Sequence, residues 1–477
     1  MWADASALIP EGVLILAALA CILARSFMIE QDFQRRSFAL SALALAGLAI
    51  WIILYAGGSR ALFGGILTED VLSRFCQVCL LLGAAASLAI GVEGGERSMI
   101  LDPYVAALFL LAVLGLLLIV GASDLIALFL GVQLYVLSSF VLIAQRDNSG
   151  RALAAGLGGT FSGFVGTALL LFGAVLVISG AGKSGYGDLA DGLSDASGVF
   201  ASAGLALVIA GLLVSLAIAP FHLWLQPSVE HAPWPVVALM LGVAPMALMT
   251  SLARVLFVAF PAFEAIWQPL LSVLGLVSAL GGMVAAFGAD RISHLLAGLV
   301  TLGAGFGLLA ISAGTTAGVT GMLALMGLHG IALVGVTAFA SMLEKDDRAV
   351  DALSDLSGLS QLQMPRVFAV FILLLSFAAL PPLAGFMIRV NIVQAVYNSG
   401  MIWQAMAGLG VTALAAFAIL RPAWRLYMVA DTRDVEVRAA RLPDLVLTVT
   451  ALAALLTLVS LAGLEAVIEA AAARLVR

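Results

Sequence analysis

The segments Ile218-Ala-Pro-Phe-His-Leu-Trp224 and Ala379-Leu-Pro-Pro-Leu-Ala-Gly-Phe386 decide the fold, because each places proline inside a long apolar run. Proline removes a backbone donor and clashes with the preceding helical turn, so each segment predicts a broken helix. Unwound backbone at membrane depth is tolerated only where protein or water satisfies its polar groups. We therefore expect functional helix breaks at Pro220, Pro381 and Pro382.

The composition indicates a membrane protein. Of the 477 residues, 63% are hydrophobic and only 10% are charged, whereas a soluble domain carries about 25% charged residues. The net charge of −6 supplies no basic groove for nucleic acid. These values exclude a soluble enzyme, a nucleic-acid-binding protein and a disordered chain. The three cysteines lie in apolar runs without repeated ligand pairs, so we expect neither a disulfide framework nor a metal site.

Fourteen apolar runs are long enough to cross a bilayer, which requires about 20 helical residues. The predicted fold is an all-α integral membrane protein with about 14 transmembrane helices. The predicted spans cover residues 7–27, 38–56, 73–91, 104–121, 125–144, 153–179, 200–220, 234–257, 267–288, 292–312, 318–342, 367–393, 401–420 and 443–463.

The Lys and Arg residues orient these spans, because cytoplasmic loops carry an excess of both. Loops after odd-numbered spans hold 15 of the 22, whereas loops after even-numbered spans and the C-terminal tail hold 5. The remaining two, Arg254 and Arg389, lie inside spans. We predict a multi-pass protein of the cell inner membrane, with cytoplasmic odd loops and both termini in the periplasm.

The two breaks fall in spans 7 and 12, five spans apart. This spacing predicts two five-helix repeats, spans 4–8 and 9–13, whose odd number of helices gives them inverted topology. Broken helices in inverted repeats are typical of transporters, where they line the ion path. The expected organisation is an N-terminal three-helix segment over 1–100, a first repeat over 101–260, a second repeat over 261–425, and a C-terminal helix and tail over 426–477.

An ordered set of motifs resembles the antiporter-like membrane subunits of respiratory complex I (NADH-quinone oxidoreductase), the subunit N family in particular. In chain order, the matching stretches are Asp124-Leu-Ile-Ala-Leu-Phe-Leu130, Pro220-Phe-His-Leu-Trp224 with Ala232-Pro-Trp-Pro-Val236, Gly242-Val-Ala-Pro-Met-Ala247, and Leu380-Pro-Pro-Leu-Ala-Gly-Phe386. The resemblance covers spans 4 to 13. It implies a fourteen-helix membrane-arm subunit that carries no cofactor, has no redox centre, and works beside other membrane subunits within the lipid bilayer to translocate protons.

The sequence departs from this family at the residues that would carry protons. The resemblance implies a glutamate in span 5 and lysines in spans 6, 7, 8 and 12. Those positions hold Gln133 in span 5, Gly158 or Gly159 in span 6, Ser215 in span 7, Met246 or Pro245 in span 8, and Arg389 in span 12. The family's histidine position in span 10 falls near Gly303.

The lysine count supports this departure without any alignment. The chain contains two lysines, Lys183 and Lys345, and both fall in predicted loops. A proton relay needs a group that binds and releases a proton, which a buried lysine does because desolvation lowers its pKa. Glutamine does not ionise, and arginine keeps its proton in proteins. We expect proton conduction by this chain to be weakened or lost.

Other polar residues within or beside the spans are candidates for an ion pathway. Arg389 is interpreted as a fixed positive charge on the path, and His329 in span 11 is the best titratable group at membrane depth. His294 lies one turn into span 10, near the predicted cytoplasmic face, and is a candidate for a proton entry. His222 and the Glu230-His231 pair flank the first break. Asp124 is interpreted as a helix cap. We expect Arg254 to reach the lipid headgroups.

Related functions remain open at this stage. The alternatives are a membrane subunit of an Mrp-type cation/proton antiporter, of a membrane-bound hydrogenase, or of a bicarbonate-uptake complex. The absence of intramembrane lysine counts against the antiporter as well. A free-standing enzyme is not expected, because the sequence shows no nucleophile–base pair and no metal cluster.

Overall fold

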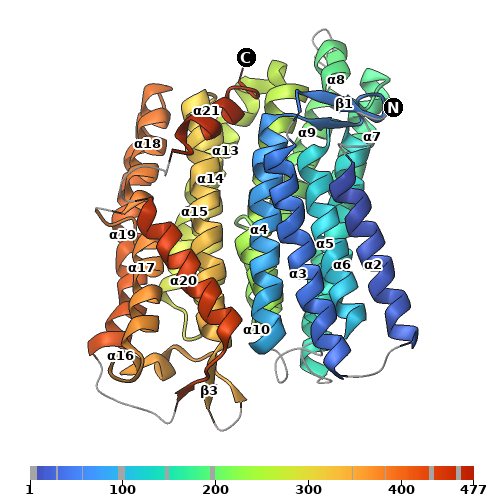
Figure 1. Ribbon diagram of the computed structural model, residues 1–477. Coiled ribbons are helices and arrows are strands. Elements are labelled where there is room, and N and C mark those ends of the chain that lie inside the picture. The colour runs from blue at the N-terminus through green and yellow to red at the C-terminus, as the bar shows by residue number, and fades with distance from the viewer. Residues whose placement is uncertain are drawn as a thin grey trace.

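The computed structural model describes residues 8–27, 31–55, 57–94, 102–144, 150–193, 199–345, 348–381, 383–428, 435–457 and 463–476. Long helices cross the molecule side by side as one bundle, and both termini lie at the same end (Figure 1). We call the opposite end, which carries α10 (Leu225–Glu230), α16 (Leu359–Leu362) and β3 (Leu343–Lys345), the β3 end.

The remaining helices in chain order are α2 (Ile9–Phe27), α3 (Gln31–Leu54), α4 (Val71–Gly94), α5 (Pro103–Gly121), α6 (Leu125–Ile143), α7 (Gly150–Ala181), α8 (Tyr186–Leu193), α9 (Val199–Ser215), α11 (Trp234–Val237), α12 (Ala244–Arg254), α13 (Glu264–Phe287), α14 (Ile292–Ser312), α15 (Thr316–Ser341), α17 (Met364–Ala378), α18 (Ala384–Asn398), α19 (Ile402–Met428), α20 (Arg441–Leu456) and α21 (Glu465–Ala472). Segments of π-helix flank α12 at Ala238–Val243 and Val255–Ala259.

Two small sheets stand at opposite ends of the bundle. Strands β1 (Arg60–Leu62) and β2 (Leu67–Glu69) form an antiparallel hairpin near the termini, with Arg60 opposite Glu69. At the β3 end, β3 pairs antiparallel with both β4 (Arg348–Ala349) and β5 (Glu436–Val437). The sheet therefore ties the connection after α15 to the one before α20.

Each of the fourteen predicted spans overlaps a helix or a broken pair of helices, and the all-α membrane fold is confirmed. Among the described residues, ten helices are long and apolar enough to cross a membrane. The count of fourteen therefore stays a prediction. Between the helices of predicted spans 6 and 7, residues 186–193 form the short helix α8, which buries Tyr186, Leu189 and Leu193.

Polar caps fix where several helices begin. The Asp124 carboxylate accepts hydrogen bonds from the backbone N–H groups of Ile126 and Ala127, which confirms it as the cap of α6. Asp102 caps α5 in the same way, ahead of Pro103, and the Thr315 hydroxyl accepts from the Gly318 N–H at the start of α15. Such caps accept hydrogen bonds from the first backbone N–H groups of a helix, which have no partner within the helix.

Both predicted helix breaks are present, and both contain an alanine with a positive φ angle. Helix α9 ends at Ser215 and α17 ends at Ala378, and an alanine with positive φ follows each: Ala217 at 51° and Ala379 at 49°. Alanine rarely adopts this left-handed conformation, so surrounding contacts must hold it. Pro220 follows the first break across a cis peptide bond, and Pro381 follows the second. Pro382 lies outside the described residues.

Side chains satisfy the backbone groups that the first break frees. The Trp224 indole donates to the Val214 carbonyl at 3.1 Å, and Ser278 accepts from the Ala219 N–H at 3.1 Å. Ser278 lies in α13, so a helix of the predicted second repeat stabilises the break in the first. The expectation that protein groups would satisfy unwound backbone is met at this break.

The expectation that Arg254 reaches the lipid headgroups was wrong. Its side chain is buried at the end of α12, and its guanidinium lies 2.9 Å from the Asp70 carboxylate at the start of α4. An ion pair across two helices therefore replaces the predicted reach to lipid headgroups, because a buried charge needs a partner.

Candidate functional site

Arg389 lies at the centre of the second helix break. Its side chain is 1% exposed, and its Nη2 donates to the Phe377 carbonyl at 2.8 Å. That carbonyl belongs to the last turn of α17, which the break leaves without a helical donor. Nε and Nη1 of Arg389 have no hydrogen-bond partner among the described residues, and its Cζ lies 5.0 Å above the Phe306 ring. The guanidinium thus caps a half-helix inside the bundle.

His329 shares Phe377 with Arg389. The imidazole of His329 is 4% exposed, and its ring centroid lies 4.8 Å from that of Phe377. Its Nε2 has no hydrogen-bond partner within the described part of the chain. Two of the predicted pathway residues therefore meet around one phenylalanine, and both carry unpaired buried nitrogens.

Gly303 makes room for this histidine. A Cβ added at Gly303 would lie 2.2 Å from Nδ1 of His329, closer than real side chains approach. The imidazole from α15 therefore fills the space beside α14 at the position where the family resemblance expects a histidine on α14 itself.

The structure distinguishes the two glycines at the expected span 6 lysine. A Cβ at Gly158 would meet nothing within 4 Å, so this position faces outward. A Cβ at Gly159 would lie 2.2 Å from the Phe140 ring and 2.9 Å from the Ser228 hydroxyl. Phe140 in turn packs edge-to-face on Trp224 with centroids 5.6 Å apart. The inward-facing space beside α7 is thus filled by aromatic rings.

The other expected relay positions hold no titratable group. Ser215 donates its hydroxyl to the Gly211 carbonyl at 3.2 Å, within its own helix, and Met246 is 4% exposed in the apolar core. Gln133 is half-buried, and the structure records no hydrogen bond for its side chain among the described residues. His222 is half-buried, and its Nδ1 likewise lacks a described partner. None of these side chains is bonded to Arg389 or His329.

A charged cluster lies at the β3 end, between the end of α10, the start of α14 and the segment before α16. His294 Nε2 lies 3.0 Å from the Glu230 carboxylate at the end of α10, and the Arg291 guanidinium lies 3.2 Å from it. Asp351 accepts from the Ser293 N–H at 2.9 Å and lies 3.7 Å from Arg291. The cluster ties the broken helix of span 7 to the start of α14. Sequence reasoning had paired Glu230 with His231 and had not found Asp351, whose partners are about 60 residues away in sequence.

The two lysines lie outside the long helices. Lys183 is exposed between α7 and α8, and its ammonium lies 2.8 Å from Asp188. This hydrogen bond and the charge of Asp188 raise the pKa of Lys183. Lys345 ends strand β3. The prediction that no lysine lies at membrane depth is consistent with both positions.

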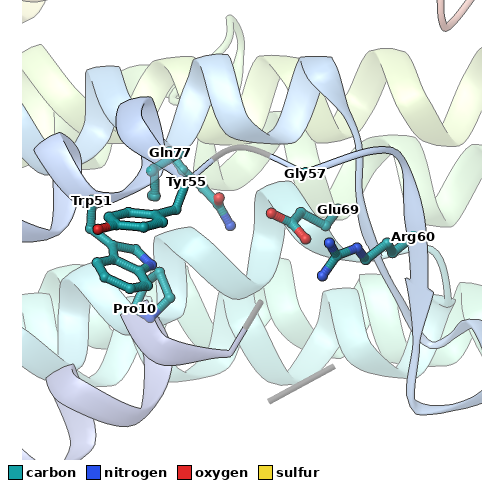
Figure 2. A pocket seen from close by; sticks show the side chains of 8 residues that line it. Pro10, Trp51, Tyr55, Gly57, Arg60, Glu69 and Gln77 are labelled. Carbon is teal, nitrogen blue, oxygen red and sulfur yellow. The ribbon is translucent and has the colours of Figure 1, made fainter. Parts of the chain in front are cut away.

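A small cavity lies near the ends of the described chain. Its volume is about 20 Å³, close to that of one water molecule. Figure 2 shows Trp51 and Tyr55 stacked on one side, with Glu69 and Arg60 pointing toward one another on the other. It is lined by Pro10, Trp51, Ile52, Tyr55, Gly57, Arg60, Glu69 and Gln77.

Comparison with known proteins decides the family. The family described as "NADH:quinone oxidoreductase/Mrp antiporter, TM" matches residues 122–415. NADH-quinone oxidoreductase subunit N of Jannaschia sp. is 32% identical over 100% of this chain and 99% of its own length. That of Rhodobacter capsulatus is 32% identical over 99% of both chains. The chain belongs to the NADH-quinone oxidoreductase subunit N family. The recognition made from its motifs is confirmed.

Solved structures of membrane complexes share the fold of this chain. A chain of respiratory complex I from Thermus thermophilus has a TM-score of 0.82 at 22% identity and covers 97% of this chain and 100% of its own. A chain of the Mrp complex from Dietzia sp. reaches 0.85 at 19% identity, covering 100% of this chain and 98% of its own. At these identities the comparison shows a shared fold and no more.

Proposed function

We propose that this chain is a membrane-arm subunit of a proton-translocating NADH-quinone oxidoreductase and conducts protons weakly or not at all. Its place in the family and the match over its whole length support the first part. The second part is supported by the residues at the expected relay positions, none of which both binds and releases a proton. The chain would then sit in the inner membrane, beside other membrane subunits, with both termini in the periplasm.

The observation that carries the weakened relay is the environment of Arg389. A relay group must alternate between charged and neutral forms, and a guanidinium stays charged in proteins. Arg389 is also held in place by the Phe377 carbonyl, so it acts as a fixed donor at a helix end. On the opposite side of the molecule, Phe140 and Trp224 occupy the space beside Gly159. Neither half of the subunit then offers a lysine for proton transfer.

The chain would contribute no redox chemistry. NADH oxidation and quinone reduction would take place on other subunits, and no cofactor would bind here.

Affinity purification of the tagged chain from native membranes in mild detergent tests the assignment. The eluate should catalyse NADH-dependent quinone reduction and show the absorption of flavin and iron–sulfur clusters. Co-elution of small antiporter subunits without those chromophores would overturn the assignment and support an Mrp-type complex. A hydrogenase or bicarbonate-uptake protein in the eluate would overturn it in the same way.

A further inference from the structure

Arg389 is a buried positive charge without a negative partner. Its side chain is 1% exposed, and its recorded hydrogen bond within the described chain goes to a neutral carbonyl, that of Phe377. A buried charge is strongly unfavourable unless a counter-charge lies beside it. Arg254, the other arginine inside a predicted span, has such a partner, because the Asp70 carboxylate lies 2.9 Å from it. The two buried arginines therefore differ in the feature that decides the cost of burial.

The helices around Arg389 contain no acidic residue. Helices α15, α17 and α18 pack against one another, and α14, which packs on α15 and α18, supplies the Phe306 ring beneath the guanidinium. Neither these four helices nor α19, which packs on α17 and α18, contain Asp or Glu. Pro382, the residue of this break outside the described part of the chain, has no charged side chain. No side chain of these helices can therefore neutralise the guanidinium.

The acidic residues that flank these helices in the sequence lie at the ends of the bundle. Arg389 is at the depth of His329, with which it shares Phe377. His329 lies near the middle of α15, roughly 18 Å or more along the helix from either end at about 1.5 Å per residue. The nearest acidic residues in sequence are Asp290, ahead of α14, and Glu344, beyond the end of α15. An ion pair requires contact within about 4 Å, so these carboxylates are too distant.

The helix ends at the break do not supply the missing charge. The Phe377 carbonyl stands at the end of α17, which carries a partial charge of roughly −0.5. The start of α18 carries roughly +0.5. Both ends meet at the break, because Gly385 in the first turn of α18 packs directly against the Ser376 carbonyl of α17. The two partial charges oppose each other, so about one positive charge is left uncompensated at Arg389.

Unpaired nitrogens surround this charge. Nε and Nη1 of Arg389 and Nε2 of His329 are all buried and have no hydrogen-bond partner among the described residues. A neutral imidazole can donate from Nε2. An anion would accept these hydrogen bonds and balance the charge at the same time. It must be small, because a side chain that is 1% exposed presents no surface to a carboxylate of a neighbouring subunit.

We propose that Arg389 binds a chloride ion inside the bundle, with His329 as a second donor. Chloride is small, monovalent and present at neutral pH, and it accepts hydrogen bonds from guanidinium and imidazole N–H groups. The bound ion neutralises the charge that the chain itself leaves unpaired at the second break. The proposal does not rest on the proposed function, because it concerns the charge balance of this chain alone.

Equilibrium dialysis of the full-length chain in detergent against radioactive chloride, with gluconate keeping the ionic strength constant, tests this site. The original chain should bind about one chloride, which bromide displaces, and Arg389→Met should bind none, because no charge then holds the ion. Arg389→Lys keeps the charge and should retain binding, which separates lost charge from lost folding. His329→Ala should bind chloride about tenfold more weakly, through the loss of one hydrogen bond to a charged group.

The matched control is Asp70→Asn/Arg254→Gln, which removes a buried arginine together with its own counter-ion. This variant should bind chloride as the original chain does. A second measurement is thermal unfolding: chloride in place of gluconate should raise the unfolding midpoint of the original chain and leave that of Arg389→Met unchanged, because a ligand of the folded state stabilises it.

Equal chloride binding by the original chain and Arg389→Met would overturn the proposal. So would the absence of binding by the original chain, because the unpaired donors would then contact water alone. Chloride that binds the isolated chain and is missing from the purified complex would contradict it as well, since a group of another subunit would then supply the negative charge.

Discussion

Gly303 on α14 and His329 on α15 share one space, since a Cβ at Gly303 would lie 2.2 Å from Nδ1 of the histidine. The absence of a side chain on one helix thus permits a buried imidazole from the next. The same imidazole packs on Phe377, whose carbonyl accepts from Arg389. Four residues from four helices are therefore interlocked at the second break.

The first prediction concerns this shared space. Gly303→Ala should destabilise the protein by about 1–3 kcal/mol, because the new methyl group overpacks the imidazole. Thermal unfolding in detergent measures the effect. The same substitution in a His329→Ala background should cost much less, because the clashing ring is absent. An equal cost in both backgrounds would contradict the contact.

The two adjacent glycines of α7 give a second prediction with an internal control. Gly159→Ala should destabilise by about 1–3 kcal/mol, because its methyl group meets the Phe140 ring. Gly158→Ala meets open space and should be neutral or stabilising by up to about 1 kcal/mol, through helix propensity. The unfolding midpoints of the Gly158→Ala and Gly159→Ala variants, compared with that of the original chain, test this prediction. Reversed effects would mean that the inward face of α7 has been assigned to the wrong glycine.

A third prediction concerns the pair Arg254–Asp70. Burial opposes ionisation of Asp70, but the charge and hydrogen bond of Arg254 outweigh it and hold the pKa of Asp70 below its ordinary value. Asp70→Asn should cost about 3 kcal/mol at neutral pH, because Arg254 remains buried without its counter-charge. The double variant Asp70→Asn/Arg254→Gln should recover part of that loss.

The pH dependence of this pair has a definite sign. A carboxyl group with a lowered pKa stabilises the fold above its unfolded pKa of about 3.9, and this contribution disappears as the pH falls through its folded value. The gap between the original chain and Asp70→Asn should therefore be constant from pH 7 to about 5 and close as the pH drops below about 4. A gap that widens in acid would contradict the assigned direction.

The sequence predicted the parts of this structure that depend on local chemistry. Proline at Pro220 and Pro381 located both breaks, and Asp124 at the start of an apolar run was a helix cap. The pairings between distant helices were not predictable. Arg254 finds its counter-ion 184 positions away, and nothing in its own segment distinguishes burial from contact with lipid.

The direction in which a side chain points could also not be predicted from the sequence. Apolar composition around α7 does not show which of Gly158 and Gly159 faces inward, because both faces of a membrane helix are apolar. The meeting of His329 and Gly303 depends on how α14 and α15 pack. Gly303, at the position where the family resemblance implies a histidine, is the one signal in the sequence that pointed to it.

The central claim is that this subunit lacks a working proton relay, and the ratio of protons translocated to electrons transferred tests it most directly. The purified complex would be reconstituted in proteoliposomes and supplied with NADH and quinone. A matched complex whose subunit N retains the membrane glutamate and lysines serves as the reference. We predict a lower ratio for the complex that contains this chain, unchanged by Arg389→Met. A ratio equal to that of the reference would contradict the claim.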